Sequence, residues 1–134
     1  MAKGSLREEL EEAAAGLQYH SESDYPFQFF TLPAESEKDL TPEGFLNRIG
    51  VSQQFREEMN LEIDQLIEER TLDGFFPASD DAEAKRFQEL EVVLRKRLRG
   101  VKVLRVGRVE IRCYIAGLDE HGYIAGLVTI SVET

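Results

Sequence analysis

The sequence has little of the chemistry that many enzymes and secreted proteins carry. It holds one cysteine, no tryptophan and two histidines. The single Cys113 excludes an internal disulfide, and no apolar run reaches the length of a membrane-spanning helix. The first residues, MAKGSLREELEE, lack the apolar core of a signal peptide. We therefore expect a cytoplasmic protein with no membrane partner.

Basic residues are also in the minority. The chain has 16 Lys and Arg against 26 Asp and Glu, a net charge of -10 at pH 7. Such a protein repels nucleic-acid phosphates and favours cationic partners, although an acidic surface also serves solubility alone. The basic residues at 95–99 have no interleaved aromatics, so we expect no direct nucleic-acid contact. The length fits one domain, residues 1–134.

Catalytic motifs are missing as well. The chain contains neither a GxSxG elbow nor a glycine-rich phosphate loop. His20 and His121 lie in polar segments without a second His or Cys at helical spacing, so we interpret both as solvated histidines. Cys113 falls on the apolar side of a strand pattern, which predicts a buried thiol. We expect no catalytic residue, no cofactor and no metal site of the protein's own.

The last stretch, residues 101–134, carries the clearest periodicity. One parity of its first half is apolar and alternates with a more polar parity, which is typical of a strand with one packed face: Val109, Ile111, Cys113 and Ile115. From Tyr123 to Val132 both parities are apolar, as in a strand covered on both faces. Gly107-Arg108 predicts a two-residue hairpin turn. These patterns predict an α+β fold in which a small sheet has helices above and below.

The first fifty residues predict two helices and one strand. Ser5 stands three residues before Glu8, a capping-box spacing, and predicts a helix from Leu6 to about Ala15. His20 to Asp24 is polar and predicts a loop, and the aromatics after Pro26 predict a strand at about 27–32. Thr41-Pro42 predicts the start of a helix that ends at Gly50.

The segment from Ser52 to Arg70 is ambiguous. One interpretation is a single helix with four residues facing inward: Phe55, Met59, Ile63 and Leu66. The other is a short extended piece, Glu58 to Glu62, followed by a helix that Asp64 caps and that runs to Arg70. Asn60 and Asp64 interrupt the helical run, which favours the second interpretation.

The strongest helical pattern follows the loop TLDGFFPASDDAE. Ser79 or Asp80 is the predicted cap. An Mg²⁺ site at Asp80-Asp81 with Glu83 is conceivable, but acids at a helix start are far more often caps. The apolar stripe of the helix is Ala84, Phe87, Leu90, Leu94 and Leu98.

Three features do not fit a purely structural interpretation. Glu22 and Asp24 are concentrated in the loop SESD, although such a turn is also explained by its capping groups. The pair Phe75-Phe76 lies in a loop, where it is either tucked onto the core or a binding anchor. The chain closes on Ser131-Val132-Glu133-Thr134, which is otherwise an ordinary frayed end. Together they indicate an acidic binding surface aimed at a cationic or metal-containing site.

Two blocks resemble a known family. GLQYHSESDYPFQFF and VLRVGRVEIRCYIAG with GYIAGLVTISVET are similar to the nuclease A inhibitor family, over about Leu6–Leu32 and Ala82–Thr134. The segment Pro33–Leu72 diverges. The motif SES-[DE]-YPF and the VET ending, found together in a chain of this length, carry the resemblance.

The resemblance implies a fold and a mechanism. The implied fold is a three-layer α-β-α sandwich around a mostly antiparallel sheet, related to the pathogenesis-related protein 1 fold. The implied partner is a bacterial sugar-non-specific endonuclease that cleaves DNA and RNA with Mg²⁺, and whose active-site cleft the inhibitor blocks. The motif acid falls on Glu22, which would meet a basic group of that site. The C-terminal threonine falls on Thr134, whose hydroxyl would reach the catalytic Mg²⁺. The family's loop tryptophan falls on Phe75, which lacks the indole N–H donor.

The predicted partner-binding residues are therefore Ser21, Glu22, Ser23, Asp24, Phe75, Phe76, Glu133 and Thr134. We expect a protein that is monomeric alone and binds its nuclease 1:1. Two alternatives stay open. One is an acidic protein-binding module of the same fold with a different host target. The other is an enzyme or small-ligand protein that uses the 20–25 loop with His20 or His121.

Overall fold

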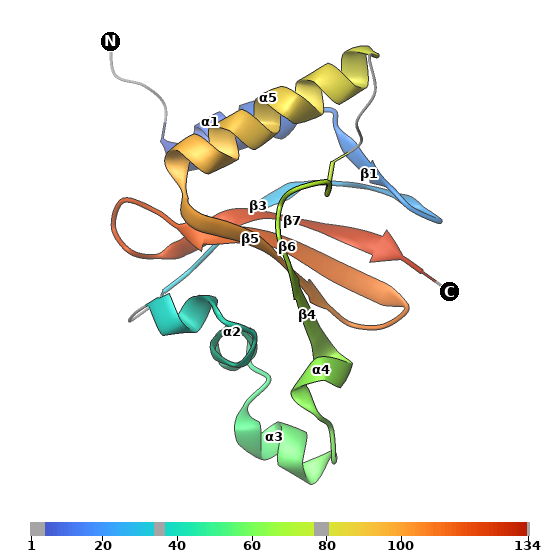
Figure 1. Cartoon of the computed structure of the whole chain (residues 1–134), viewed down its shortest axis with the longest axis vertical. Coiled ribbons are helices and arrows are strands. Elements are labelled where there is room, and N and C mark those ends of the chain that lie inside the picture. The colour runs from blue at the N-terminus through green and yellow to red at the C-terminus, as the bar shows by residue number, and fades with distance from the viewer. Residues whose placement is uncertain (1–4, 34–36, 77–80, 134) are drawn as a thin grey trace.

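The computed structural model describes residues 5–33, 37–76 and 81–133. Its elements in chain order are α1 (Leu6–Ala14), β1 (Gln18–His20), β2 (Asp24–Pro26), β3 (Gln28–Leu32), the 3-10 helix η1 (Glu37–Leu40), α2 (Pro42–Arg48), α3 (Gln53–Glu58), α4 (Ile63–Leu66), β4 (Ile67–Arg70), α5 (Ala82–Arg97), β5 (Arg99–Val106), β6 (Glu110–Leu118) and β7 (Ile124–Val132). The fold is mixed, with helices and two antiparallel sheets (Figure 1).

The larger sheet has five strands in the order β3-β7-β6-β5-β4. β6 and β7 pair along their whole length, from Glu110 opposite Val132 to Leu118 opposite Ile124. The smaller sheet is the hairpin β1-β2. All pairings in both sheets are antiparallel. The inner strands of the larger sheet are β7, β6 and β5, so the C-terminal segment forms its middle, as its periodicity predicted.

The core is divided into two apolar clusters. The first joins α1 and α5 to the sheet residues Cys113, Ile115 and Leu127. The second joins α2 to Leu104, Ala116 and Ile124, which have the opposite parity. The expected burial of both parities of β7 is thereby confirmed for Ile124, Ala125 and Leu127. Helices α1 and α5 lie on one side of the sheet and α2 lies on the other (Figure 1).

The predicted helix starts are confirmed at α1 and α2. The hydroxyl of Ser5 accepts from the Glu8 N–H at 3.2 Å, and the hydroxyl of Thr41 accepts from the Gly44 N–H at 3.2 Å. Each oxygen satisfies an amide that has no partner inside the helix. For α5 the cap is Asp81, whose carboxylate accepts from the Ala84 N–H at 2.8 Å. Ser79 and Asp80 lie outside the described residues.

Neither interpretation of the segment from Ser52 to Arg70 is right. Ser52 caps α3 through the Phe55 N–H, and the chain then turns at Asn60, whose φ of 56° is left-handed. Glu62, not Asp64, caps α4. The predicted helix to Arg70 stops at Leu66, because the next four residues pair with β5 as an edge strand. Propensity was overridden here by a tertiary contact.

The inward face proposed for this segment is wrong at Phe55 and Met59, whereas Ile63 and Leu66 do pack against the second cluster. Phe55 is 46% exposed and Met59 is 58% exposed. Arg56 takes the buried position instead, and its guanidinium donates to the Val51 carbonyl at 2.9 Å. A short helix cannot bury two faces, and its hydrogen-bonded arginine occupies the covered one.

The predicted two-residue turn at Gly107-Arg108 is wrong as well. β5 ends at Val106 and β6 begins at Glu110, so residues 107–109 connect them. The Gly107 N–H donates to the Leu66 carbonyl at 2.9 Å, and a Cβ on Gly107 would lie 2.6 Å from the Glu110 carbonyl oxygen. This close approach, at a φ of 118°, requires glycine. Val109 then falls in the connection and is 55% exposed instead of packed.

Among the helices that the structure describes, none combines the length and the apolar character that crossing a bilayer requires.

Candidate functional site

The segment that the sequence predicted as a loop is a β-hairpin. Gln18–His20 pairs with Asp24–Pro26, with Tyr19 opposite Tyr25, and only residues 21–23 form the turn. The prediction of a loop from His20 to Asp24 is therefore wrong at both ends. Three-residue strands are marginal alone, and this hairpin is held by Thr129 of β7, whose hydroxyl donates to the Pro26 carbonyl at 3.0 Å.

The turn of the hairpin is bonded to the end of β7. The Val132 N–H donates to the Ser21 hydroxyl at 2.9 Å, and the Ser21 hydroxyl donates to the Ser23 carbonyl at 2.9 Å. In return, the Glu22 N–H donates to the Val132 carbonyl at 3.2 Å. We call this set, Ser21, Glu22, Ser23 and Val132, the hairpin junction. It places the exposed Glu22 beside the last residues of β7.

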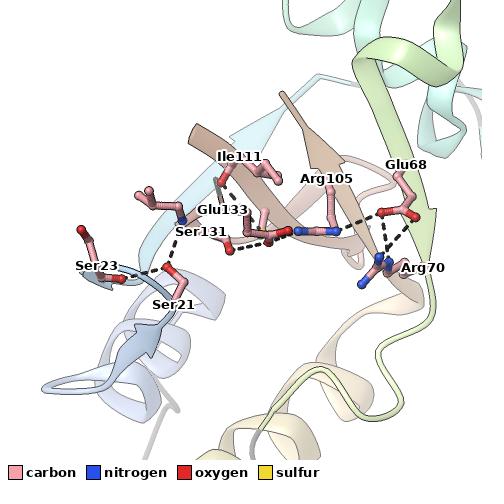
Figure 2. Close-up of polar contacts among 10 residues, drawn as sticks. Ser21, Ser23, Glu68, Arg70, Arg105, Ile111, Ser131 and Glu133 are labelled. Atoms are coloured by element: carbon pink, nitrogen blue, oxygen red, sulfur yellow. Dashed lines mark hydrogen bonds and ion pairs between the residues drawn. The ribbon is translucent and has the colours of Figure 1, made fainter. Parts of the chain in front are cut away.

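Glu133, the residue after β7, begins a row of ion pairs that crosses the sheet toward the edge strand β4. Its carboxylate accepts from the Ser131 hydroxyl at 2.7 Å and pairs with Arg105. Arg105 also pairs with Glu68 at 3.0 Å, and Glu68 pairs with Arg70 at 3.0 Å. We call these residues the arginine network; Figure 2 shows it running from β7 to β4 next to the hairpin junction. Thr134 lies outside the described residues.

In the arginine network, the charged partners of Arg105 and Glu68 offset the cost of burying their charges. Burial works against the charge of Arg105, but Cys113, Glu68 and Glu133 outweigh it and raise the pKa of Arg105 above its usual value. Desolvation likewise opposes the charge of Glu68, yet hydrogen bonds from Arg70 and Arg105 lower the pKa of that carboxyl. Both groups are charged at neutral pH. Sequence reasoning missed Arg105, and the one available signal was that it shares a strand parity with Val101 and Val103.

The two loop phenylalanines have different environments. Phe75 is half-buried and stacks on Tyr19 of the hairpin, with ring centroids 4.9 Å apart. Phe76 is 7% exposed and stacks on Phe87 of α5 at 5.2 Å. Phe76 therefore belongs to the core, as the plainer interpretation had it, and Phe75 joins the loop to the hairpin. Burial raises the pKa of Tyr19, with the same effect from Cys113, so its hydroxyl is uncharged at neutral pH.

A hollow of about 400 Å³ lies between the hairpin, this loop and the end of β7. Its lining combines both signs of charge with aromatic rings: Tyr19, Arg70, Thr71, Asp73, Gly74, Phe75, Arg105 and Glu133.

His20 is not the plain solvated histidine that the sequence predicted. Its Nδ1 lies 2.9 Å from an Asp24 carboxylate oxygen, and its Nε2 lies 2.9 Å from a Glu83 carboxylate oxygen. Carboxylates only accept, so both bonds form together when the ring is a doubly protonated imidazolium. The bonds to Asp24 and then Glu83 raise the pKa of His20. The exposed imidazole thus joins the hairpin to the first turn of α5.

Cys113 and His121 are the other candidate groups. Cys113 is 1% exposed, as predicted, and burial raises the pKa of its thiol. His121 follows β6 in the connection to β7, at the opposite end of β7 from the hairpin junction. Strand geometry puts roughly 25 Å between those ends. Within residues 5–33, 37–76 and 81–133, no three His, Cys, Asp or Glu side chains gather as a metal site. Asp81 serves as a cap.

The candidate site is an exposed, acidic surface. It presents Glu22, Asp24 and Glu133 from two structural units that are hydrogen-bonded to each other. No curated protein matches the sequence. The model of a protein family described as "Nuclease A inhibitor-like protein" matches residues 4–134, which is nearly the whole chain. The protein belongs to the nuclease A inhibitor-like family.

Proposed function

We propose that this protein inhibits a Mg²⁺-dependent, sugar-non-specific endonuclease by binding 1:1 in its active-site cleft. Family membership supports a nuclease as the partner. The observation that carries the mechanism is the hairpin junction, because it holds Glu22 against the end of β7 through bonds in both directions. An acid and the residues leading to Thr134 then enter a cleft together.

Each part of the surface has a role in this proposal. Glu22 takes the place of a substrate phosphate toward an Arg or Lys of the nuclease. Thr134 offers its hydroxyl to the nuclease's Mg²⁺, a hard cation that prefers oxygen ligands. Phe75 and the hollow beside it receive a side chain from the rim of the cleft, and Phe76 supports the loop from the core.

Net charge assists the encounter. A nuclease cleft is built to attract a polyanion, and a chain of net charge -10 is steered toward it as the substrate is. Ser21 and Ser23 shape the turn, and Asp24 and Glu133 add negative charge beside Glu22. The inhibitor itself needs no metal and no catalytic residue. We place its action in the cytoplasm of a bacterium that makes such a nuclease.

The proposal includes the family fold. A three-layer α-β-α arrangement related to the pathogenesis-related protein 1 fold accords with two apolar clusters of opposite parity. In that arrangement the hairpin junction lies at the C-terminal end of β7, and this end of the sheet would enter the cleft.

The test is an inhibition assay with both substrates. Purified protein is titrated into a Mg²⁺-dependent sugar-non-specific endonuclease acting on plasmid DNA and, separately, on RNA. We expect loss of both activities at a 1:1 ratio, and a strong loss of potency when Thr134 is deleted. A Mg²⁺-dependent restriction endonuclease is the matched control and should be unaffected. Undiminished cleavage across a panel of such non-specific enzymes at micromolar inhibitor would overturn the proposal.

A further inference from the structure

Arg105 occupies an unusual place in the sheet. It faces the same side as the buried Val103 and lies opposite Cys113 on β6 and Glu68 on β4. Its side chain is only 11% exposed. A charged group at such a position has to be compensated, since its desolvation is otherwise costly.

Two carboxylates, one on each side of β5 within the sheet, compensate the charge of Arg105. One nitrogen of the guanidinium pairs with Glu68 of β4 at 3.0 Å. The other reaches across β6 to Glu133, which follows β7. A single side chain thus connects three strands that are not all adjacent, and Figure 2 shows the row from Glu68 through Arg105 to Glu133.

Glu133 is held at three points. Its carboxylate meets Arg105 and the Ser131 hydroxyl, and its N–H donates to the Val109 carbonyl at 2.8 Å. The preceding residue, Val132, is bonded to Ser21 and Glu22 in the hairpin junction. Glu133 is therefore connected, through Val132, to the turn that carries Glu22.

We propose that Arg105 is a positioning residue of the inhibitory surface, which fixes Glu133 and, through it, the end of β7 and the Glu22 turn in one arrangement. The functional half of this inference rests on the proposed inhibition. Arg105 also lines the hollow beside Phe75, but the role proposed for it is to hold Glu133 and not to bind the nuclease directly. It acts by lowering the entropy that the chain end and the hairpin turn would lose on binding.

Arginine is required for geometric reasons. Its planar guanidinium presents separate nitrogens to two carboxylates and stays charged at every physiological pH. A lysine ammonium is a point charge on a flexible stem, so it can pair with Glu68 or Glu133 but holds both poorly. Arg105→Lys therefore keeps the positive charge but weakens the bridge between Glu68 and Glu133, whereas Arg105→Gln removes the charge as well.

The structural half is tested by amide hydrogen exchange, which needs no nuclease. In Arg105→Gln we expect exchange at Val132, Glu133 and Glu22 to become faster by about tenfold or more, with α5 amides unchanged. Arg105→Lys should fall between Arg105→Gln and wild type. Arg48→Gln is the matched control, because Arg48 also forms a partly buried ion pair, with Asp39 at 3.1 Å, on the other face of the sheet. Unchanged exchange at the three amides in Arg105→Gln would overturn the inference.

The functional half is tested by the inhibition constant. Arg105→Gln should weaken inhibition by about tenfold, Arg105→Lys by less, and Arg48→Gln not at all. Adding Arg105→Gln to Glu133→Gln should produce almost no further loss, since both substitutions remove the same contact. Independent, additive losses would overturn the inference. If wild type inhibits no nuclease, the proposed function fails, and the exchange experiment still decides whether Arg105 positions the chain end.

Discussion

The N–H of Val132 donates to the hydroxyl of Ser21 at 2.9 Å, across 111 positions of sequence. This bond closes the N-terminal hairpin onto the last strand of the sheet. The Glu22 N–H returns a bond to the Val132 carbonyl, so the turn and the strand end are held as a pair. The acidic turn is thereby anchored to the sheet.

Ser21→Ala tests that bond directly. The partly buried Val132 N–H loses its acceptor, and we expect a loss of about 1–3 kcal/mol in the free energy of unfolding. Urea denaturation measures it. Ser23→Ala is the control, because Ser23 takes part through its backbone carbonyl, which the substitution keeps. Equal stability of the two variants would contradict the role given to the Ser21 hydroxyl.

Glu22→Gln separates binding from folding. The side chain is exposed, so the free energy of unfolding should change by less than about 0.5 kcal/mol. Removing its charge leaves a basic group of the nuclease without its partner, and we expect inhibition to weaken by about 2 kcal/mol or more, roughly thirtyfold. The inhibition constant and a urea titration are the two measurements. Glu12→Gln removes an equally exposed acid from α1 and should inhibit like wild type; a matching loss there would show that only net charge matters.

His20 makes the anchoring of the hairpin depend on pH. Its folded-state pKa is raised above the ordinary 6.5 by Asp24 and Glu83, the two charged groups that face the ring. The stabilising contribution is therefore complete below pH 6.5 and is lost as the pH rises through the folded-state pKa. We expect faster amide exchange at β1 and β2, relative to α5, on the alkaline side of that pKa.

His20→Gln should remove this pH dependence, and His121→Gln, in the distant β6–β7 connection, should retain it. An NMR titration of the His20 ring gives the pKa itself. A His20 pKa at or below 6.5 would contradict the bridging geometry.

Phe75 and Phe76 are neighbours with different expected effects. Phe76→Ala removes a ring from the core and should cost about 3–5 kcal/mol of unfolding free energy. Phe75→Ala removes a half-buried ring that stacks on Tyr19 and should cost less stability but weaken inhibition more. Phe75→Trp adds an indole N–H at the same place and should bind at least as tightly as wild type. Equal effects of both alanine substitutions on inhibition, after correction for unfolded protein, would contradict this division.

Much of the scaffold was predictable because its signals are local. The alternation in residues 110–115 and the apolar run at 124–127 are local strand patterns, and Ser5 and Thr41 cap helices through bonds within a few residues. The stripe of α5 follows from helical geometry and is buried as predicted from Ala84 to Leu98. These features can be predicted from the sequence because they do not depend on which distant segments pack against them.

The elements that were predicted wrongly depend on partners that are distant in the sequence. β4 is a strand because β5 offers an unpaired edge, and the hairpin β1-β2 exists because β7 supports it. The same reason hid the role of His20, whose second partner, Glu83, lies 63 positions away.

By itself, the sequence determined the acidic charge, the central antiparallel strands, the long helix and the absence of a recognisable catalytic motif, since each follows from composition or from a short-range period. Only the tertiary structure decided that Glu22 lies against the end of β7 and that Arg105 ties Glu133 to Glu68. Those contacts join residues that the chain separates widely, and only the pairing of strands brings them within hydrogen-bond distance.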